Sequence, residues 1–221
     1  MIIDCISDIH GYEPKLKGGD LLIIAGDLTR NDTAQEYIDL HEWLIELKKY
    51  SKIIIVPGNH DNYLQDASIY DFAHLQSGLI TYLCDSGTEF EGLNIWGSPW
   101  TKSFEGMNPR CKAFVLGTDE ELDEKFDIIP QETNILITHS PAYGIYDCVS
   151  RMHGELHEWD YTGSKHLRNI AFSLPHLKLH VCGHIHEHGG KVVDLVSSKF
   201  VNASHVNKYY EPAHDAVRVE L

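Results

Sequence analysis

The chain contains five short apolar segments, and each is followed at once by Asp, His or Asn side chains. The segments are Ile2–Ile6, Leu21–Ala25, Ile53–Val56, Asn134–Thr138 and Lys178–Cys182. The motifs that follow them are, in chain order, Ser7-Asp8-Ile9-His10, Gly26-Asp27, Pro57-Gly58-Asn59-His60-Asp61, His139-Ser140-Pro141 and Gly183-His184-Ile185-His186. Because the carboxyl ends of strands form the ligand crevice of an open α/β sheet, these polar side chains are expected to converge.

A single motif of this kind carries little information, because the chain also contains Asp39-Leu40-His41 within a helical pattern. Residues i and i+2 diverge on a helix, whereas they share a face at the end of a strand. The order of five such strand ends, rather than any one of them, therefore predicts a shared site.

Apolar strands alternate with helical patterns in the first half of the chain, which favours an α/β sandwich. A helix is predicted from Thr33 to Tyr50, with Asp32 or Thr33 as its N-cap. Further helices are predicted at Asp119–Asp127 and Ser164–Leu174, and further strands at Leu79–Leu83, Glu89–Phe90, Asn94–Trp96, Lys191–Leu195, Lys199–Asn202 and Ala216–Val219. The segment Ser140–Gly163 is predicted to be a loop that borders the site, since it follows His139.

Composition and charge exclude several classes of protein. The 221 residues, 43% hydrophobic and 23% charged, are expected to form one domain spanning 1–221. No apolar run approaches the roughly 20 residues that a membrane helix needs. The formal net charge of −15 disfavours binding to a nucleic-acid duplex. Five cysteines without a CxxC pair, and no signal-peptide pattern, lead us to expect a cytoplasmic protein, and the oligomeric state stays open.

The side chains after the five strands are those that bind divalent first-row metals. Imidazole nitrogens and carboxylate oxygens ligate such ions, and a carboxylate can bridge two of them. Two ions about 3.5–4 Å apart can share a hydroxide and stabilise an in-line displacement at phosphorus. The absence of thiolates argues against a structural zinc site. Seven ligands are available, namely Asp8, His10, Asp27, Asn59, His139, His184 and His186.

His60 is a candidate proton donor, because it follows Asn59 and precedes Asp61. An imidazole titrates near neutral pH, and a carboxylate such as that of Asp61 can fix its tautomer. Such a group can protonate a leaving alkoxide. The alternative is that His60 is a structural or metal-ligating histidine.

The combined motifs resemble the calcineurin-like metallophosphoesterase superfamily. The residues that carry this resemblance are Asp8-x-His10, Gly26-Asp27-x-x-Arg30, Gly58-Asn59-His60-Asp61, His139 and Gly183-His184-x-His186. Further segments resemble the metallophosphoesterase-domain-containing phosphodiesterases, namely Gly97-Ser98-Pro99-Trp100-Thr101, Ile135–Pro141, Lys178–Glu187 and Asn202-Ala203-Ser204. Some animal members of that group carry Gly at the position of His184, so His184 implies a complete two-metal site here. His139-Ser140-Pro141 departs from the more usual His-Gly-Pro.

The resemblance implies a four-layer αββα sandwich of two mixed sheets flanked by helices. It implies that Asp27 bridges the two ions, that a bridging hydroxide attacks phosphorus, and that His60, beside Asp61, protonates the leaving group. Mn²⁺ is a common activating ion in the family, with Fe, Zn, Ni and Co as alternatives. The carried-over ligands are Asp8, His10 and His186 for one metal, and Asn59, His139 and His184 for the other.

Several functions are compatible with this reading of the sequence. The leading hypothesis is a two-metal phosphodiesterase acting on a small phosphoester, with a cyclic nucleotide as one candidate. The same ligands would serve a phosphomonoesterase or phosphoprotein phosphatase, and the net charge makes a nuclease a weaker rival. A metal-binding interaction module without catalysis is the alternative from another class.

Overall fold

A computed structural model of the chain describes residues 1–66, 78–104, 107–153 and 156–221. The helices in these ranges are α1 (Ala34–Glu46), α2 (Asn62–Asp66), α3 (Asp119–Asp127) and α4 (Lys165–Ser173), with a 3-10 helix at His186–His188. The strands are β1 (Ile2–Ile6), β2 (Leu21–Ala25), β3 (Lys52–Val56), β4 (Ile80–Tyr82), β5 (Ser86–Phe90), β6 (Leu93–Ser98), β7 (Thr101–Lys102), β8 (Val115–Leu116), β9 (Ile135–Thr138), β10 (Cys148–His153), β11 (Leu156–Tyr161), β12 (Leu179–Cys182), β13 (Lys191–Leu195), β14 (Ser198–Asn202) and β15 (Val217–Glu220).

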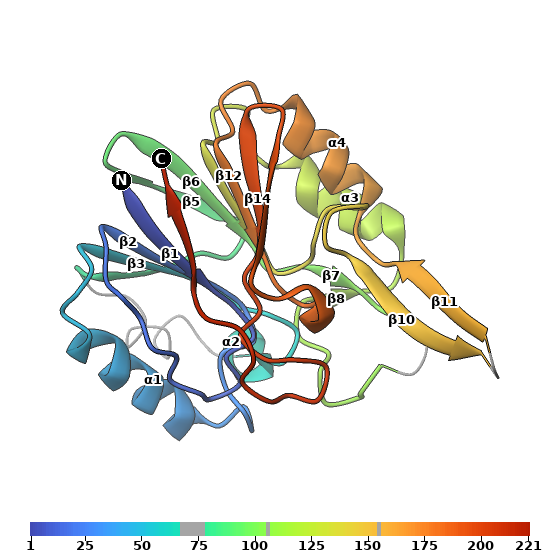
Figure 1. The fold of residues 1–221 in the computed structure, drawn as a ribbon, viewed down its shortest axis with the longest axis horizontal. Coiled ribbons are helices and arrows are strands. Elements are labelled where there is room, and N and C mark those ends of the chain that lie inside the picture. The colour runs from blue at the N-terminus through green and yellow to red at the C-terminus, as the bar shows by residue number, and fades with distance from the viewer. Residues whose placement is uncertain (67–77, 105–106, 154–155) are drawn as a thin grey trace.

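Two mixed sheets form the centre of the molecule (Figure 1). The first has the order β15-β1-β2-β3-β4, in which β1 to β4 run parallel and β15 is antiparallel to β1. The second has the order β13-β14-β12-β9-β6-β5, with parallel inner strands and antiparallel pairs at both edges. Parallel strands bring their carboxyl ends to the same edge of a sheet.

The apolar strands are buried on both faces, as their sequences predict. Successive residues of β2 alternate between two clusters, because side chains alternate across a strand. Ile23 faces the second sheet and packs in one cluster with Ile135 and Val181. Ile24 faces the other way and packs with Tyr37 and other residues of α1.

Helices cover the outer faces of both sheets. Tyr37, Leu40 and Leu44 of α1 pack on the first sheet. On the second sheet, Phe126 of α3 and Leu167 of α4 join a separate cluster. The prediction of an α/β sandwich of two mixed sheets flanked by helices is therefore confirmed (Figure 1).

The first helix is capped as predicted but ends earlier. Thr33, rather than Asp32, is the N-cap and forms a capping box with Glu36. The helix ends at Glu46 instead of continuing to Tyr50. Tyr50 lies beyond the helix, and its hydroxyl donates a hydrogen bond to Oδ2 of buried Asp4 at 2.6 Å.

The prediction of a loop over Ser140–Gly163 is wrong in its second half. β10 and β11 form an antiparallel ribbon there, with Cys148 opposite Tyr161. Figure 1 shows this ribbon extending away from the two sheets. The ribbon is separate from the two large sheets, and its sequence lacks the apolar alternation that identifies a half-buried strand. Within the described ranges, no helix is long and apolar enough to cross a bilayer.

Candidate metal centre

The five strand ends meet at one place, although they belong to two different sheets. Asp8 and His10 follow β1, Asp27 follows β2, and Asn59 follows β3. His139 follows β9, and His184 and His186 follow β12. The sheets are joined here by backbone hydrogen bonds, including one from Ser7 N to the Ala203 carbonyl at 2.8 Å.

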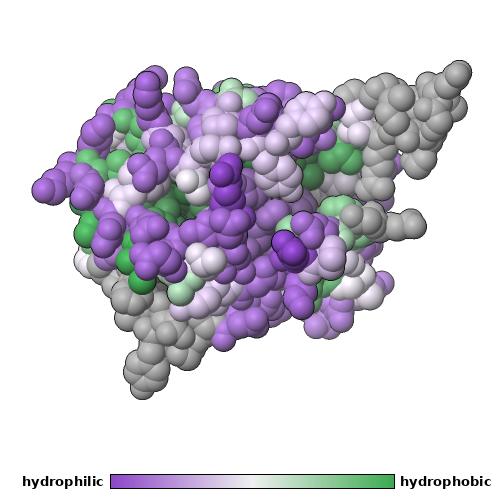
Figure 2. All heavy atoms as spheres, turned by 90° about the horizontal axis from the view of Figure 1, so that it is seen from below, coloured by the Kyte–Doolittle hydropathy of each residue, from purple (hydrophilic) through white to green (hydrophobic). Residues whose placement is uncertain are grey.

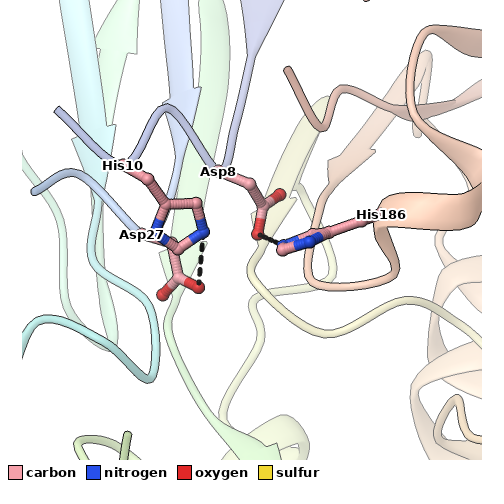
Figure 3. Close-up of side chains that lie close together, drawn as sticks. All are labelled: Asp8, His10, Asp27 and His186. Carbon is pink, nitrogen blue, oxygen red and sulfur yellow. Dashed lines mark hydrogen bonds and ion pairs between the residues drawn. The ribbon is translucent and has the colours of Figure 1, made fainter. Parts of the chain in front are cut away.

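Four of the predicted ligands form one buried group (Figure 3). Each of Asp8, His10, Asp27 and His186 offers a ligand atom, and these atoms all lie within 4.8 Å of one another. Nε2 of His186 lies 3.2 Å from Oδ1 of Asp8. Nε2 of His10 lies 3.7 Å from Oδ2 of Asp27.

The other three predicted ligands form an adjoining group around the Asn59 amide. Oδ1 of Asn59 lies 2.9 Å from both Nε2 of His139 and Nδ1 of His184. Nε2 of His139 also lies 3.4 Å from Oδ1 of Asp27. The two carboxylate oxygens of Asp27 therefore face different groups, Oδ2 toward His10 and Oδ1 toward His139.

The arrangement of donor atoms fits metal ions. Nδ1 of His139 donates a hydrogen bond to the Ala25 carbonyl at 2.9 Å, which leaves a lone pair on Nε2. Nδ2 of Asn59 is directed at the Cys111 carbonyl, so the amide oxygen faces that lone pair. Two electron-pair donors 2.9 Å apart repel unless a cation lies between them. Nε2 of His10 is buried without a hydrogen-bond partner among the described residues, as a metal-binding nitrogen would be.

The protonation states also suit cation binding, since ligating imidazoles must be neutral. Burial lowers the pKa of His10 to about 4 and that of His184 to about 3. Burial alone would raise the pKa of Asp8, but the hydrogen bond from His186 and the surrounding imidazoles hold it well below its ordinary value. His10 and His184 thus present neutral nitrogens beside ionised carboxylates, in a protein interior where unpaired negative charge is costly.

A second set of contacts orients the ligands, as is usual at metal sites. The hydroxyl of Ser204 donates to Oδ2 of Asp8 at 2.6 Å, and the His184 backbone N–H donates to the same oxygen at 3.0 Å. The His60 backbone N–H donates to Oδ1 of Asp27 at 2.9 Å. Asn202 acts on the backbone instead, because its amide donates to the Ile185 carbonyl at 3.0 Å.

The backbone at four ligands is in the left-handed region. The φ angles are +49° at Asp8, +43° at His10, +55° at Asp27 and +67° at His184. This conformation costs a non-glycine residue about 1–2 kcal/mol and is typical of functional sites. The residue types at these four positions do not predict a left-handed backbone.

The glycines that precede ligands serve two purposes. Gly26 has a φ of +102°, a conformation that glycine adopts without steric cost. Gly183 is needed for lack of space, because a Cβ there would lie 2.2 Å from Oδ2 of Asp8. A Cβ at Gly26 would likewise lie 2.3 Å from Nδ1 of His139, so close packing requires glycine at both positions and the positive φ adds a second reason at Gly26.

His60 lies beside the candidate ligands and is more accessible than the buried ones among them, such as His10 and Asp27. Its Nε2 lies 3.7 Å from Oδ2 of Asp27, and its side chain is 18% exposed. Its ring centroid is 4.7 Å from that of His10. On its other side, Nδ1 of His60 lies 3.4 Å from the Cys111 thiol.

Asp61 does not take the expected position beside the His60 ring. Its carboxylate accepts hydrogen bonds from the backbone N–H groups of Gly58, Asp27 and Leu28, at 2.7, 3.0 and 3.0 Å. Burial and the nearby charge of Asp27 raise the pKa of Asp61 to about 7. Among the described contacts, Cys111 is the side chain that neighbours Nδ1 of His60, so Asp61 is a positioning residue for the loops after β2 and β3.

A cavity of about 340 Å³ opens onto the centre. Val149 and Thr162 line it, which confirms that the segment after His139 borders the site. Figure 2 shows the molecule from below, the side on which α2 and the turn before β15 lie in Figure 1, and hydrophilic side chains dominate the middle of this face. The described lining residues are Asp27, Asn59, His60, Phe104, Met107, Asn108, Cys111, Val149, Thr162, His184, Ile185, His186, Glu187, Lys208 and Tyr210.

Tyr210, Ser204 and Cys111 are contributors that the sequence analysis does not identify as site residues. They lie outside the named helices and strands, in segments without apolar periodicity, and their residue types occur in other places along the chain. Only the three-dimensional arrangement distinguishes them.

Comparison with known proteins places this geometry in a family. A family model described as calcineurin-like phosphoesterase matches residues 1–188. The Homo sapiens Metallophosphoesterase domain-containing protein 1 is 32% identical over 240 residues, which cover 98% of this chain and 70% of that protein. The Probable glycerophosphodiester phosphodiesterase GpdQ of Arcobacter nitrofigilis is 25% identical over 190 residues, which cover 84% of this chain and 62% of that protein.

A solved structure shares the fold. The crystal structure of TT1561 of Thermus thermophilus superposes with a TM-score of 0.60 at 16% identity, and the match covers 93% of this chain and 89% of that one. At this identity the likeness concerns the arrangement of helices and strands alone.

Proposed function

The chain belongs to the calcineurin-like phosphoesterase family, and on that premise we propose that it hydrolyses small phosphodiesters with two divalent metal ions. The observation that carries the proposal is the position of Asp27. One of its oxygens faces His10 and the other faces His139. A single carboxylate therefore lies between the two adjoining groups of candidate ligands and is in reach of both.

Each ligand has a role in this proposal. Asp8, His10 and His186 would hold one ion, Asn59, His139 and His184 would hold the other, and Asp27 would contribute to both. Bound ions would supply Lewis acidity and an activated water. We propose Mn²⁺ because it is a common activating ion in the family. Fe, Zn, Ni and Co are alternatives, since the same nitrogen and oxygen donors accept all of them.

His60 is the proposed proton donor. Its imidazole lines the cavity and lies on the accessible side of Asp27, where a leaving group can reach it. It gives its Nε2 proton to the departing alkoxide, and Asp61 supports this step by fixing the loop on which His60 is carried.

Two observations support a diester over a monoester. The relative from Arcobacter nitrofigilis carries a name that assigns it to glycerophosphodiesters. Among the described residues that line the cavity, Lys208 is the one lysine or arginine. A diester brings one negative charge, whereas a monoester dianion brings two and would gain more from additional cations.

The test compares two chromogenic substrates on Mn²⁺-loaded protein. Bis-p-nitrophenyl phosphate should be hydrolysed, and p-nitrophenyl phosphate should be hydrolysed more slowly. The Asp27→Ala variant should bind less metal and lose both activities. Turnover of the monoester alone would replace the proposal with a phosphomonoesterase, and bound metal without turnover of either substrate would indicate an interaction module.

A further inference from the structure

Tyr210 covers the metal centre from a part of the chain that the family model does not match. The match ends at residue 188, and Tyr210 lies in the turn that precedes the last strand, β15. Its ring centroid lies 4.9 Å from that of His10, 5.0 Å from that of His186 and 5.8 Å from that of His60. One aromatic ring therefore contacts ligands and the proposed proton donor together.

The turn fixes this ring in place. Oδ1 of Asn207 accepts hydrogen bonds from the backbone N–H groups of Tyr209 and Glu211, at 2.8 and 3.2 Å. The Tyr210 N–H donates to the Asn207 carbonyl at 2.8 Å, and Tyr210 itself has a left-handed φ of +62°. The Tyr12 hydroxyl donates to the Tyr210 carbonyl at 3.3 Å. A strained residue held by this many contacts is typical of a functional position.

The hydroxyl of Tyr210 is available for a ligand. The residue lines the cavity together with Asp27, Asn59 and His60. The residue is 46% exposed, and none of the hydrogen bonds found in the described part of the chain involves its hydroxyl, whereas its backbone N–H and carbonyl are engaged. Its neighbour Tyr209 is absent from the described lining, is 69% exposed and stacks with Lys208 instead.

The charge balance of the cavity indicates what the hydroxyl binds. The walls include the carboxylates of Asp27 and Glu187 but Lys208 as the one lysine or arginine among the described lining residues. A phosphoryl group in the cavity exposes oxygens that need hydrogen-bond donors, and a neutral phenol supplies one without adding a charge.

We propose that Tyr210 is a substrate-contacting residue whose hydroxyl donates a hydrogen bond to a phosphoryl oxygen of the bound ester, an inference that rests on the proposed function. The ring, packed against three histidines, sets the position of that donor. The residue thereby adds a phosphate-binding group from outside the region shared with the family model.

Two conservative variants test this inference. Tyr210→Phe keeps the ring and its contacts with the histidines but removes the donor. Tyr209→Phe is the matched control, because it removes the hydroxyl of the adjacent tyrosine, which does not line the cavity in the described structure. Each Mn²⁺-loaded protein is titrated with inorganic phosphate by calorimetry, and its metal content, thermal midpoint, kcat and KM for bis-p-nitrophenyl phosphate are measured.

Tyr210→Phe should retain metal content and thermal midpoint, while the phosphate dissociation constant rises about 10- to 100-fold, as expected for one hydrogen bond to a charged group. kcat/KM should fall by a similar factor, and Tyr209→Phe should match the parent. A phosphate affinity of Tyr210→Phe within about twofold of the parent overturns the inference. If the parent protein binds phosphate but does not hydrolyse the diester, the proposed function fails, and the phosphate titrations still decide the role of Tyr210.

Discussion

The Ser204 hydroxyl donates a hydrogen bond to Oδ2 of Asp8 at 2.6 Å, and both residues are buried. Ser204 follows β14 of one sheet, and Asp8 follows β1 of the other. The contact thus links the two sheets at the point where the metal ligands meet.

Replacing Ser204 with Ala should weaken metal binding while leaving the fold intact. The free carboxylate oxygen of Asp8 loses one of its orienting donors, and loss of such contacts typically costs about 10–100-fold in metal affinity. Mn²⁺ titration of the variant measures the effect. Ser198→Ala is the control, because Ser198 begins β14, the strand that Ser204 follows, and its hydroxyl donates to the Leu177 carbonyl instead. Equal Mn²⁺ affinities for the two variants would contradict the role assigned to Ser204.

Replacing His60 with Ala should slow hydrolysis without removing metal. An acid catalyst contributes about 10²–10⁴-fold when the leaving group is a poor one, such as an alkoxide, and much less when it is p-nitrophenolate. For a series of diesters, the rate of the His60→Ala variant should therefore fall further below the parent rate as the pKa of the leaving group rises. His166→Ala, at a histidine that pairs with Asp127, serves as the control. A uniform rate loss, or loss of bound metal, would identify His60 as a structural or ligating residue.

Metal uptake should release a proton near neutral pH. Burial disfavours the charged form of His186, but its hydrogen bond with Asp8 and the charge of that carboxylate raise its pKa above the ordinary 6.5. Since a ligating imidazole is neutral, apparent metal affinity should increase as the pH rises through this raised pKa and then level off. His10 and His184, with pKa values of about 4 and 3, add no such dependence above roughly pH 5.

Calorimetric Mn²⁺ titrations in buffers of different ionisation enthalpy count the protons released. A heat of binding that does not depend on the buffer at about pH 6.5, the ordinary pKa of an imidazole, would show that His186 is already neutral before the ion binds.

The ion pair between Asp4 and Arg218 should stabilise the fold most at neutral pH. Burial alone would raise the pKa of Asp4, but hydrogen bonds from Arg218 and Tyr50 hold it below 3.8. Because the folded pKa is the lower one, this contribution is complete above the unfolded pKa and is lost as the pH falls through the folded pKa. Arg218→Met should therefore lower the melting temperature by several degrees at pH 7 and by less in acid.

Thermal unfolding at a series of pH values between neutral and acid measures this difference. Arg168→Met provides the comparison, because Arg168 stacks on Phe172 and has no ion pair within the described chain. A melting-temperature difference for Arg218→Met that stays constant with pH would contradict the assignment.

The layers of the fold and the convergence of the seven candidate ligands could be predicted because both depend on local sequence. Buried parallel strands are apolar throughout, and each ligand stands within four residues of the end of such a strand. The ends of neighbouring parallel strands meet whatever the connections between them contain. Asp8 and His186 could therefore be placed in one site although 178 positions separate them.

The features that could not be predicted depend on the direction in which a side chain points, and not on its position in the sequence. Asp61 follows His60 in sequence, yet its carboxylate points toward Asp27 N–H, because adjacent side chains on a tight turn diverge. Tyr210 reaches the centre through a left-handed turn that no apolar pattern announces. The strands β10 and β11 belong to neither large sheet, and their sequences lack the alternation of apolar residues by which a strand is predicted.

The hydrogen bonds of Asp61 have a consequence for how the protein moves. The Asp61 carboxylate accepts hydrogen bonds from the backbone of both Gly58 and Asp27. It therefore couples the loop that carries His60 to the loop that carries Asp27, so that the two loops move together. The backbone that carries His60 therefore keeps its position relative to Asp27 for as long as these hydrogen bonds persist.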